Sequence, residues 1–215
     1  MNLNNKIRNI DPESPDPNIL QEASEIIRCG GTVVFPTQCL YGLAADARNP
    51  DAVAEIFRIK GRSSHKPLLV LIKNQQVLKA IVKDIPPQAL KLMLQFWPGK
   101  LTIIFFAQNN LPGVLTGKTG KIGVRLPGHC VASMLTQLME NPITGTSANL
   151  SGMPGCFNIR DLESQILHEV DLVLDAGPLS GGIGSTVIDV TEKQPLILRE
   201  GVISTDQIFS CLNRI

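Results

Sequence analysis

Near-continuous runs of apolar residues, five or six long, constrain the fold of this chain most strongly. Leu68–Ile72 and Leu101–Phe106 are the clearest examples. Runs of this length between turn-forming residues predict strands, and the absence of polar alternation predicts that both faces of the sheet are covered. Shorter or less continuous runs predict further strands at Thr32–Phe35, Ile122–Leu126, Pro142–Thr146, Val170–Leu174, Thr186–Val190 and Leu196–Leu198.

Segments with helical spacing lie between these runs. Apolar residues recur with a helical period from Ile19 to Ile27, and Gly30 and Gly31 follow. Asn49 and Pro50 form an N-cap and first-turn pair that predicts another helix. Helices are also expected after Pro86, after His129, around Leu162–Leu167 and after Ser204. The irregular alternation predicts an α/β fold, a mixed sheet with helices packed on it.

The length of 215 residues suits one domain. The Pro-rich stretch 11–17 ends a predicted N-terminal lead-in, residues 1–17, and residues 18–215 form the predicted domain. The N-terminus lacks the apolar core of a signal peptide, and no apolar run is long enough to span a membrane. The five cysteines are widely spaced without a C-x-x-C pair. These features predict a cytoplasmic protein with free thiols and no membrane partner.

The charge balance limits the partners that the surface can attract. The 20 Lys and Arg residues nearly equal the 19 Asp and Glu residues, and aromatic residues are only 4% of the chain. A protein that coats nucleic acid is far more basic, and one that stacks bases needs aromatic platforms. Any basic site must therefore be local.

Glycine and hydroxyl residues gather in six loops, most of them next to the ends of predicted strands, where open α/β sheets place ligands. These loops are Pro36–Leu43, Lys60–Pro67, Lys118–Arg125, Gly145–Gly152, Ser180–Thr186 and Arg199–Gly201.

The same loops carry basic residues with few carboxylates among them. If they converge, they form a cationic pocket that suits a triphosphate or another polyanion, because arginine pairs bidentately with phosphate oxygens and lysine adds point charge. The alternative is that these residues are ordinary solvated charges and turn glycines. The basic residues are Lys60, Arg62, Lys66, Lys121, Arg125 and Arg199.

Standard catalytic motifs fit the chain poorly. Gly113–Thr119 resembles a P-loop but is one residue short and leads into a strand-like run. There is no G-x-S-x-G nucleophile elbow, and no Cys or His pair has zinc-ligand spacing. We therefore expect no metal ligands from protein side chains.

Seven segments, taken in order, resemble the motifs of the YrdC/Sua5 family, the threonylcarbamoyl-AMP synthases. The resemblance covers nearly the whole chain after residue 18. The chain ends soon after the last motif and thus resembles the short form of the family. The segments are Pro36–Leu43, Lys60–Arg62 with Lys66–Leu68, Trp97–Thr102, Val124–His129, Ser147–Gly152, Ser185–Asp189 and Leu198–Gly201.

The resemblance implies a YrdC-like twisted mixed sheet with a cationic concave face. It also implies a nucleotidyltransferase that converts L-threonine, bicarbonate and ATP into threonylcarbamoyl-adenylate and pyrophosphate. The product serves the N6-threonylcarbamoyl modification of adenosine in tRNAs that read ANN codons, so tRNA or tRNA-modification enzymes are implied as partners. Mg²⁺ is expected to arrive with the nucleotide. The oligomeric state stays open.

The resemblance also assigns roles to individual positions. Lys60 and Arg62 would be catalytic, close to the phosphates or the carbamate. Cys39, Arg125 and Ser185 would bind L-threonine, with Arg125 pairing with its carboxylate. The residues implied for ATP binding are Arg62, Lys66, Ser147, Asn149, Gly155 and Arg199.

Departures from the family pattern leave other functions open. Cys39 stands where the family usually has threonine, and a thiol is the weaker hydrogen-bond donor. Lys66 takes a position that is Asn in many members. The alternatives are an RNA-binding module, or an enzyme of the same fold that makes a carbamoyl-adenylate from another substrate.

Overall fold

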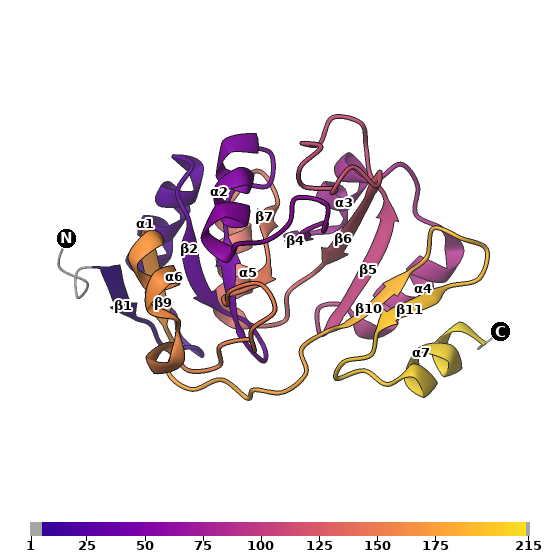
Figure 1. Cartoon of the computed structure of the whole chain (residues 1–215). Coiled ribbons are helices and arrows are strands. Elements are labelled where there is room, and N and C mark those ends of the chain that lie inside the picture. The colour runs from indigo at the N-terminus through magenta and orange to yellow at the C-terminus, as the bar shows by residue number, and fades with distance from the viewer. Residues whose placement is uncertain (1–5, 214–215) are drawn as a thin grey trace.

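The computed structural model describes residues 6–213, which form two twisted sheets side by side with helices around them (Figure 1). The five-stranded sheet has the order β1-β9-β2-β3-β8, with β3 antiparallel to both of its neighbours and the other pairs parallel. Its strands are β1 (Ile7–Asn9), β9 (Leu172–Asp175), β2 (Val33–Pro36), β3 (Tyr41–Ala44) and β8 (Thr146–Ser147).

The six-stranded sheet has the order β11-β10-β5-β6-β4-β7. The pairs β10·β5 and β4·β6 are parallel and the other pairs are antiparallel. The strands are β11 (Leu196–Arg199), β10 (Thr186–Asp189), β5 (Leu101–Phe106), β6 (Lys121–Arg125), β4 (Leu69–Leu71) and β7 (Ile143–Thr144).

The helices begin and end largely where the capping residues indicate. Asn49 accepts hydrogen bonds from the amides of Asp51 and Ala52 and starts α2, and Gly61 ends that helix with a φ of 56°. Ser204 and Gln207 form a capping box at α7. The helices are α1 (Pro17–Arg28), α2 (Pro50–Lys60), α3 (Gln75–Ile81), α4 (Pro87–Phe96), α5 (Cys130–Leu138), α6 (Ser164–Glu169) and α7 (Thr205–Leu212). Within the described residues, none of these helices is long and apolar enough to cross a membrane.

The expectation of one sheet is wrong, and Gly145 marks the reason. The run Pro142–Thr146, which we predicted as one strand, divides into β7 in the six-stranded sheet and β8 in the five-stranded sheet. A Cβ atom at Gly145 would lie 2.8 Å from side-chain atoms of both Leu69 and Leu71. Apolar patterning predicts strands but does not say which sheet each one joins, so the change of sheet could not be read from the sequence.

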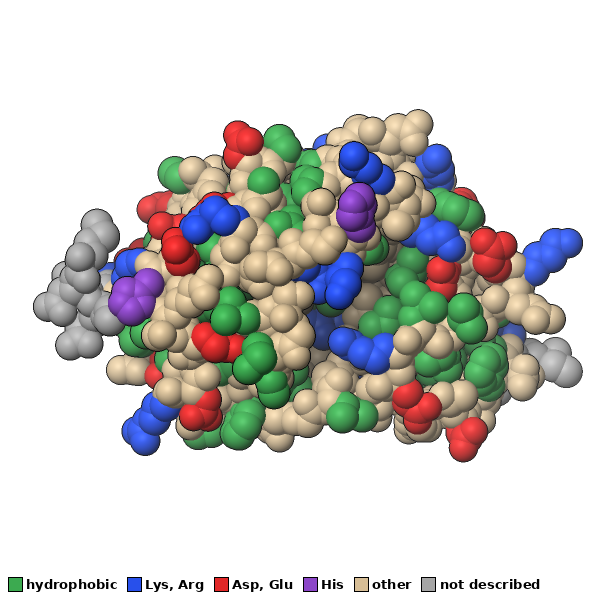
Figure 2. Space-filling view, in the orientation of Figure 1, with side chains coloured by type: hydrophobic (Ala, Val, Ile, Leu, Met, Phe, Trp, Pro, Cys, Tyr) green, Lys and Arg blue, Asp and Glu red, His purple; other side chains and the backbone are tan. Residues whose placement is uncertain are grey.

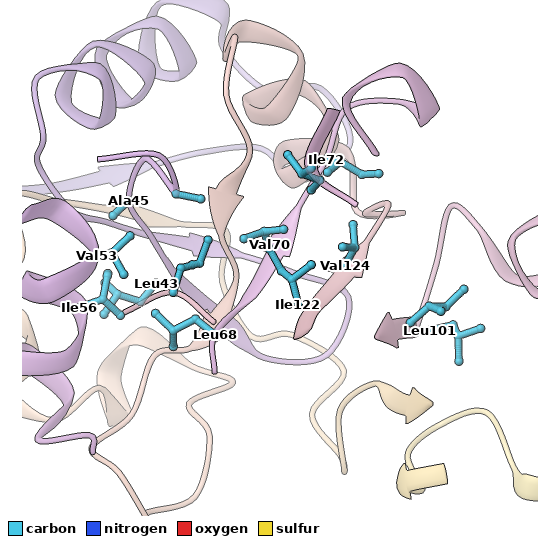
Figure 3. Close-up of a cluster of buried hydrophobic side chains, with 14 of the residues drawn as sticks. Leu43, Ala45, Val53, Ile56, Leu68, Val70, Ile72, Leu101, Ile122 and Val124 are labelled. Atoms are coloured by element: carbon cyan, nitrogen blue, oxygen red, sulfur yellow. The ribbon is translucent and has the colours of Figure 1, made fainter. Parts of the chain in front are cut away.

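One apolar core joins the two sheets. Leu43 comes from β3, whereas Val70 and Val124 come from β4 and β6 of the other sheet, and all three belong to one buried cluster (Figure 3). Val53 and Ile56 on α2 pack into the same cluster. The two sheets are therefore held to each other by buried apolar contacts.

Two strands and one helix lie outside our sequence predictions. β1 falls within residues 1–17, which we predicted as a lead-in, and it pairs in parallel with β9. β3 overlaps the end of the segment Pro36–Leu43, which we treated as a loop. α3 is the missed helix.

Candidate active site

A pocket of about 470 Å³ lies where the two sheets meet. Figure 2 shows this hollow near the centre of the face, with Lys and Arg side chains around and inside it. Residues from both sheets line it, among them Arg62, Lys100, Lys121, Arg125 and Arg199. Asp189 is the one carboxylate among the described residues that line it. The lining is therefore strongly cationic, although the whole chain has a net charge of only +1.

Strand register explains why distant residues share one wall. Ile103 on β5 pairs with Val124 on β6, and continuing this register sets Arg125 opposite Thr102. Thr102 pairs with Val187 on β10, and Val187 pairs with Arg199 on β11. Paired residues point to the same face of a sheet, so these four residues form one row across it, and all four line the pocket.

Hydrogen bonds fix Ser185 beside this row. Arg199 donates from Nε and Nη2 to the Ser185 carbonyl oxygen at 3.1 and 2.7 Å, and from Nη2 to Ser185 Oγ at 3.2 Å. Ser185 Oγ lies 3.1 Å from Thr102 Oγ1. Ser185 and Thr102 are both buried. Two hydroxyl groups are thus held beside a guanidinium in the pocket wall.

The Arg125 guanidinium makes no hydrogen bond and no ion pair with the described residues. The side chain is only 8% exposed, and its buried Nε makes no hydrogen bond. Burial lowers the pKa of Arg125 to about 10; the Cys39 thiol opposes this shift and the Arg199 charge adds to it. Arg125 therefore stays charged at neutral pH. A buried cation without a partner is costly for the fold and is suited to a bound anion.

The opposite wall comes from the five-stranded sheet. The turn from β2 to β3 brings Thr37, Gln38 and Cys39 to the pocket, and β8 brings Ser147. Ser147 lies beside Gly42 in the β3·β8 pair. The motifs at 36–43 and 147–152, which are far apart in the sequence, are therefore neighbours in the fold.

Lys60 holds the loop that carries Ser147 by hydrogen bonds to its backbone. Its ammonium donates to the carbonyl oxygens of Ser147 and Asn149, and the side chain is 2% exposed. Asn149 in turn donates to the carbonyls of Leu150 and Met153 at 2.7 and 2.8 Å, and its Oδ1 accepts from Ser147 Oγ. Burial and the Arg62 charge lower the pKa of Lys60 to about 8, against the opposing effect of Glu163. Neither Lys60 nor Asn149 lines the pocket.

The loop after α2 places Arg62 and Lys66 differently. Arg62 lines the pocket and donates from Nη2 to the Pro67 carbonyl at 3.1 Å. Lys66 is exposed and does not line the pocket. Gly155 does not line it either; a Cβ atom there would lie 2.6 Å from Leu40 Cδ1, so the glycine allows Leu40 to pack closely.

The structure thus brings six predicted site residues together and leaves four outside. The six that line the pocket are Cys39, Arg62, Arg125, Ser147, Ser185 and Arg199. The four outside its lining are Lys60, Lys66, Asn149 and Gly155.

Thr102 and Lys100 also line the pocket, and we predicted no role for either from the sequence. Thr102 carries the one hydroxyl in the run Leu101–Phe106, and an inward-facing hydroxyl in a buried strand is a signal that could have identified it. Lys100 directly precedes the same strand.

Protein carboxylates provide few ligands for a metal ion in this pocket. In residues 6–213 no three His, Cys, Asp or Glu side chains are grouped so that they could hold a metal ion. Asp189 already pairs with Lys121 at 2.9 Å and accepts hydrogen bonds from Thr191. A divalent cation in this pocket would therefore need most of its oxygen ligands from a bound anion.

Comparison with known proteins gives the family. The sequence model of the family described as "Telomere recombination" (Sua5, YciO and YrdC) matches residues 25–201. The threonylcarbamoyl-AMP synthases of Pyrococcus abyssi and Bacillus subtilis are 37% and 36% identical to this chain, each over 90% of it. The chain spans 57% and 56% of the lengths of these two relatives, or little more than half.

Solved structures agree with this assignment. The structure of P. abyssi Sua5 complexed with L-threonine superposes with a TM-score of 0.92 at 35% identity, covering 97% of this chain and 61% of that one. E. coli YciO gives a TM-score of 0.86 at 26% identity, covering 94% and 98% of the two chains. The mixed α/β fold predicted from the sequence is confirmed, and the chain belongs to the Sua5/YciO/YrdC family.

Proposed function

We propose that this chain is a threonylcarbamoyl-AMP synthase, which joins L-threonine, bicarbonate and ATP into threonylcarbamoyl-adenylate and releases pyrophosphate. The observation that carries the proposal is the unpartnered, buried Arg125 guanidinium in a cationic pocket between the sheets. The two synthases of 37% and 36% identity support the choice of reaction.

Arg125 would pair with the carboxylate of L-threonine. The pair would restore the hydrogen bonds that its guanidinium lacks, and a charge-assisted bidentate pair also fixes orientation. Ser185 and Thr102 present hydroxyls in the same wall, and Cys39 presents its thiol from the opposite wall. L-Threonine, with a carboxylate, an ammonium and a hydroxyl on three carbons, matches this set of groups. The P. abyssi protein complexed with L-threonine supports this choice of amino acid.

Arg62, Ser147 and Arg199 would bind ATP. Their groups border the pocket, and guanidinium groups stabilise charge that moves between phosphate oxygens during adenylation. Mg²⁺ would arrive on the phosphates, as the scarcity of free carboxylates suggests. The carbamate formed from the threonine amine and bicarbonate would attack the α-phosphate, so the chain needs to hold the reactants in line and has no need of a nucleophile.

Lys60 and Asn149 would act as positioning residues. Lys60 holds the carbonyls of Ser147 and Asn149, so its charge would act on ATP through the loop that carries Ser147. The catalytic role predicted for Lys60 and the ATP contacts predicted for Lys66 and Gly155 stay predictions.

The adenylate is an activated carbamoyl donor, so the next step would be transfer to an amine, which supports tRNA adenosine as the final acceptor. All five cysteines are free, which supports the cytoplasmic location expected from the sequence.

The test is pyrophosphate release measured with ATP and all combinations of L-threonine and bicarbonate. We expect release only when both are present, and detection of threonylcarbamoyl-adenylate by mass spectrometry. Release that is indifferent to L-threonine would overturn the proposal. The matched variants are Arg125→Met, in the pocket wall, and Arg58→Met, whose guanidinium pairs with Glu55 and Glu169 on the surface.

A further inference from the structure

Cys39 lies in the pocket opposite a cation that lacks a partner. Cys39 belongs to the turn between β2 and β3 of the five-stranded sheet, whereas Arg125 ends β6 of the six-stranded sheet. Both residues line the same pocket. Cys39 acts to raise the pKa of Arg125, against the larger effect of burial, so the two side chains are close enough to influence each other. Thiol and guanidinium thus both border the hollow that would receive the amino acid, each from a different sheet.

Backbone hydrogen bonds hold the turn that carries Cys39. The carbonyl oxygen of Cys39 accepts a hydrogen bond from Gly181 N at 3.0 Å, and Thr37 N donates to the carbonyl of Leu40 at 3.2 Å. Cys39 is 5% exposed, and it takes part in the lining of the pocket, so solutes of pocket size can approach it.

Cys39 shares the pocket with the guanidinium groups of Arg125 and Arg199. Thiolates are the reactive form of cysteine, and neighbouring arginine charges favour them. Arg199 adds a second guanidinium to the same row of the sheet. Of the described cysteines, Cys39 alone lines the pocket, so an oxidised Cys39 would have no resolving thiol beside it.

We propose that Cys39 is a modification site for small hydroperoxides, at which oxidation to the sulfenic acid closes the amino-acid side of the pocket. The Cys39 sulfur attacks one peroxide oxygen, so that an S–O bond forms and the O–O bond breaks. The sulfur loses two electrons, and the second peroxide oxygen leaves with the thiol proton, as water from hydrogen peroxide or as the alcohol from an alkyl hydroperoxide. The sulfenate formed when the acid loses its own proton pairs with Arg125 and takes the position of a substrate carboxylate. The oxidation of Cys39 does not depend on the proposed function. The expected loss of activity rests on the proposed function.

The primary test measures chemistry at the sulfur and not activity. The protein is treated with hydrogen peroxide in the presence of dimedone, and labelling at each cysteine is followed by peptide mass spectrometry. Cys29 is the internal control, because it is exposed and lies outside the pocket. We expect Cys39 to be labelled about tenfold faster than Cys29, as one charge-assisted contact to the anion would give. Labelling of Cys29 with Cys39 left as the thiol would overturn the proposal.

Arg125→Met tests the cause of the reactivity. We expect the labelling rate of Cys39 to fall by about tenfold in this variant, with its thermal unfolding still cooperative. A rate that is unchanged would show that Arg125 does not activate the thiol, and the proposal would fail. Iodoacetate and iodoacetamide give a second measure that needs no oxidant: the anionic reagent should be favoured at Cys39 relative to Cys29, and this preference should vanish in Arg125→Met.

Activity supplies a separate readout. Peroxide-treated protein should lose pyrophosphate release, and dithiothreitol should restore it. Cys39→Thr should keep after peroxide whatever activity it had before treatment, and Cys29→Ser should respond as the natural sequence does. L-Threonine should protect Cys39 from dimedone. Labelling at Cys39 without protection by L-threonine would support the modification site and count against the proposed function, so the two failures are distinguishable.

Discussion

Arg199 donates two hydrogen bonds, from Nε and Nη2, to the single carbonyl oxygen of Ser185. The strand that carries Arg199, β11, is an edge strand with mostly exposed side chains, so this contact ties the edge of the sheet to the pocket. It also leaves Ser185 Oγ between Arg199 and Thr102.

Arg199→Lys should weaken the contact between β11 and Ser185 in the pocket wall. A lysine ammonium is a point charge and cannot reproduce the planar double donation. We expect kcat/KM for adenylate formation to fall by about 10- to 100-fold, the equivalent of losing one or two hydrogen bonds to a charged group. Steady-state pyrophosphate assays check this, with thermal melting as the control for folding. Full activity in Arg199→Lys would show that the double donation has no catalytic importance.

Arg125→Met should increase the free energy of unfolding and weaken the binding of L-threonine. Removing a buried cation without a partner relieves its desolvation cost, so we expect unfolding to require about 1–3 kcal/mol more free energy. The same change should raise the KM for L-threonine by about 100-fold or more while ATP binding changes little. Urea unfolding and isothermal titration measure the two effects. A variant that loses both stability and activity would instead mark Arg125 as a structural residue.

Lys60 predicts a pH-dependent stability difference. Its pKa in the folded chain is about 8, below the usual value of 10.5, chiefly because of burial. The unfolded chain therefore binds more protons between these values, and the Lys60 contribution to stability increases as the pH rises from about 8 to 10.5. Relative to Lys60→Met, the natural sequence should gain up to about 3 kcal/mol across this window.

Urea unfolding of both proteins at several pH values tests this prediction. Lys66→Met, at an exposed position, controls for the loss of one lysine. A stability difference between the natural sequence and Lys60→Met that does not change with pH would contradict the depressed pKa.

Gly201→Ala should disturb Ser185 through the backbone. A Cβ atom at Gly201 would lie 2.4 Å from Ser185 C and 2.5 Å from Thr186 N, contacts that backbone atoms cannot easily yield. We expect a loss of about 1–3 kcal/mol in the free energy of unfolding, together with a loss of activity. Gly113→Ala is the matched control, because a Cβ atom there meets nothing within 4 Å. Equal behaviour of the two variants in denaturant titrations would refute this account of the Ser185 turn.

The elements of the fold were largely predictable, and their assembly was not. Apolar runs and caps located strands such as β5 and helices such as α2, because these signals are local. β3 was not predicted, because Gly42 and the Pro36–Thr37 break are typical of a loop. The structure buries its residues fully in the sheet. The division at Gly145 depends on contacts with Leu69 and Leu71, which are distant in the sequence.

The candidate site shows the same limit. The loops that carry basic residues were identifiable by composition, and six of the ten predicted site residues line the pocket. Lys60 has the residue type and motif of a substrate contact, but its ammonium turns toward the carbonyls of Ser147 and Asn149. The direction of a long side chain at a helix end depends on tertiary packing, which the spacing of residues does not record.

The most direct measurement of the central claim is the binding of L-threonine to the natural chain and to Arg125→Met, by isothermal titration in the presence of ATP. We expect L-threonine to bind the natural chain and to lose at least about 100-fold in affinity for Arg125→Met, with both proteins folded. Equal affinity of the two proteins for L-threonine would contradict it, because the amino acid would then bind without the guanidinium that the pocket leaves unpartnered.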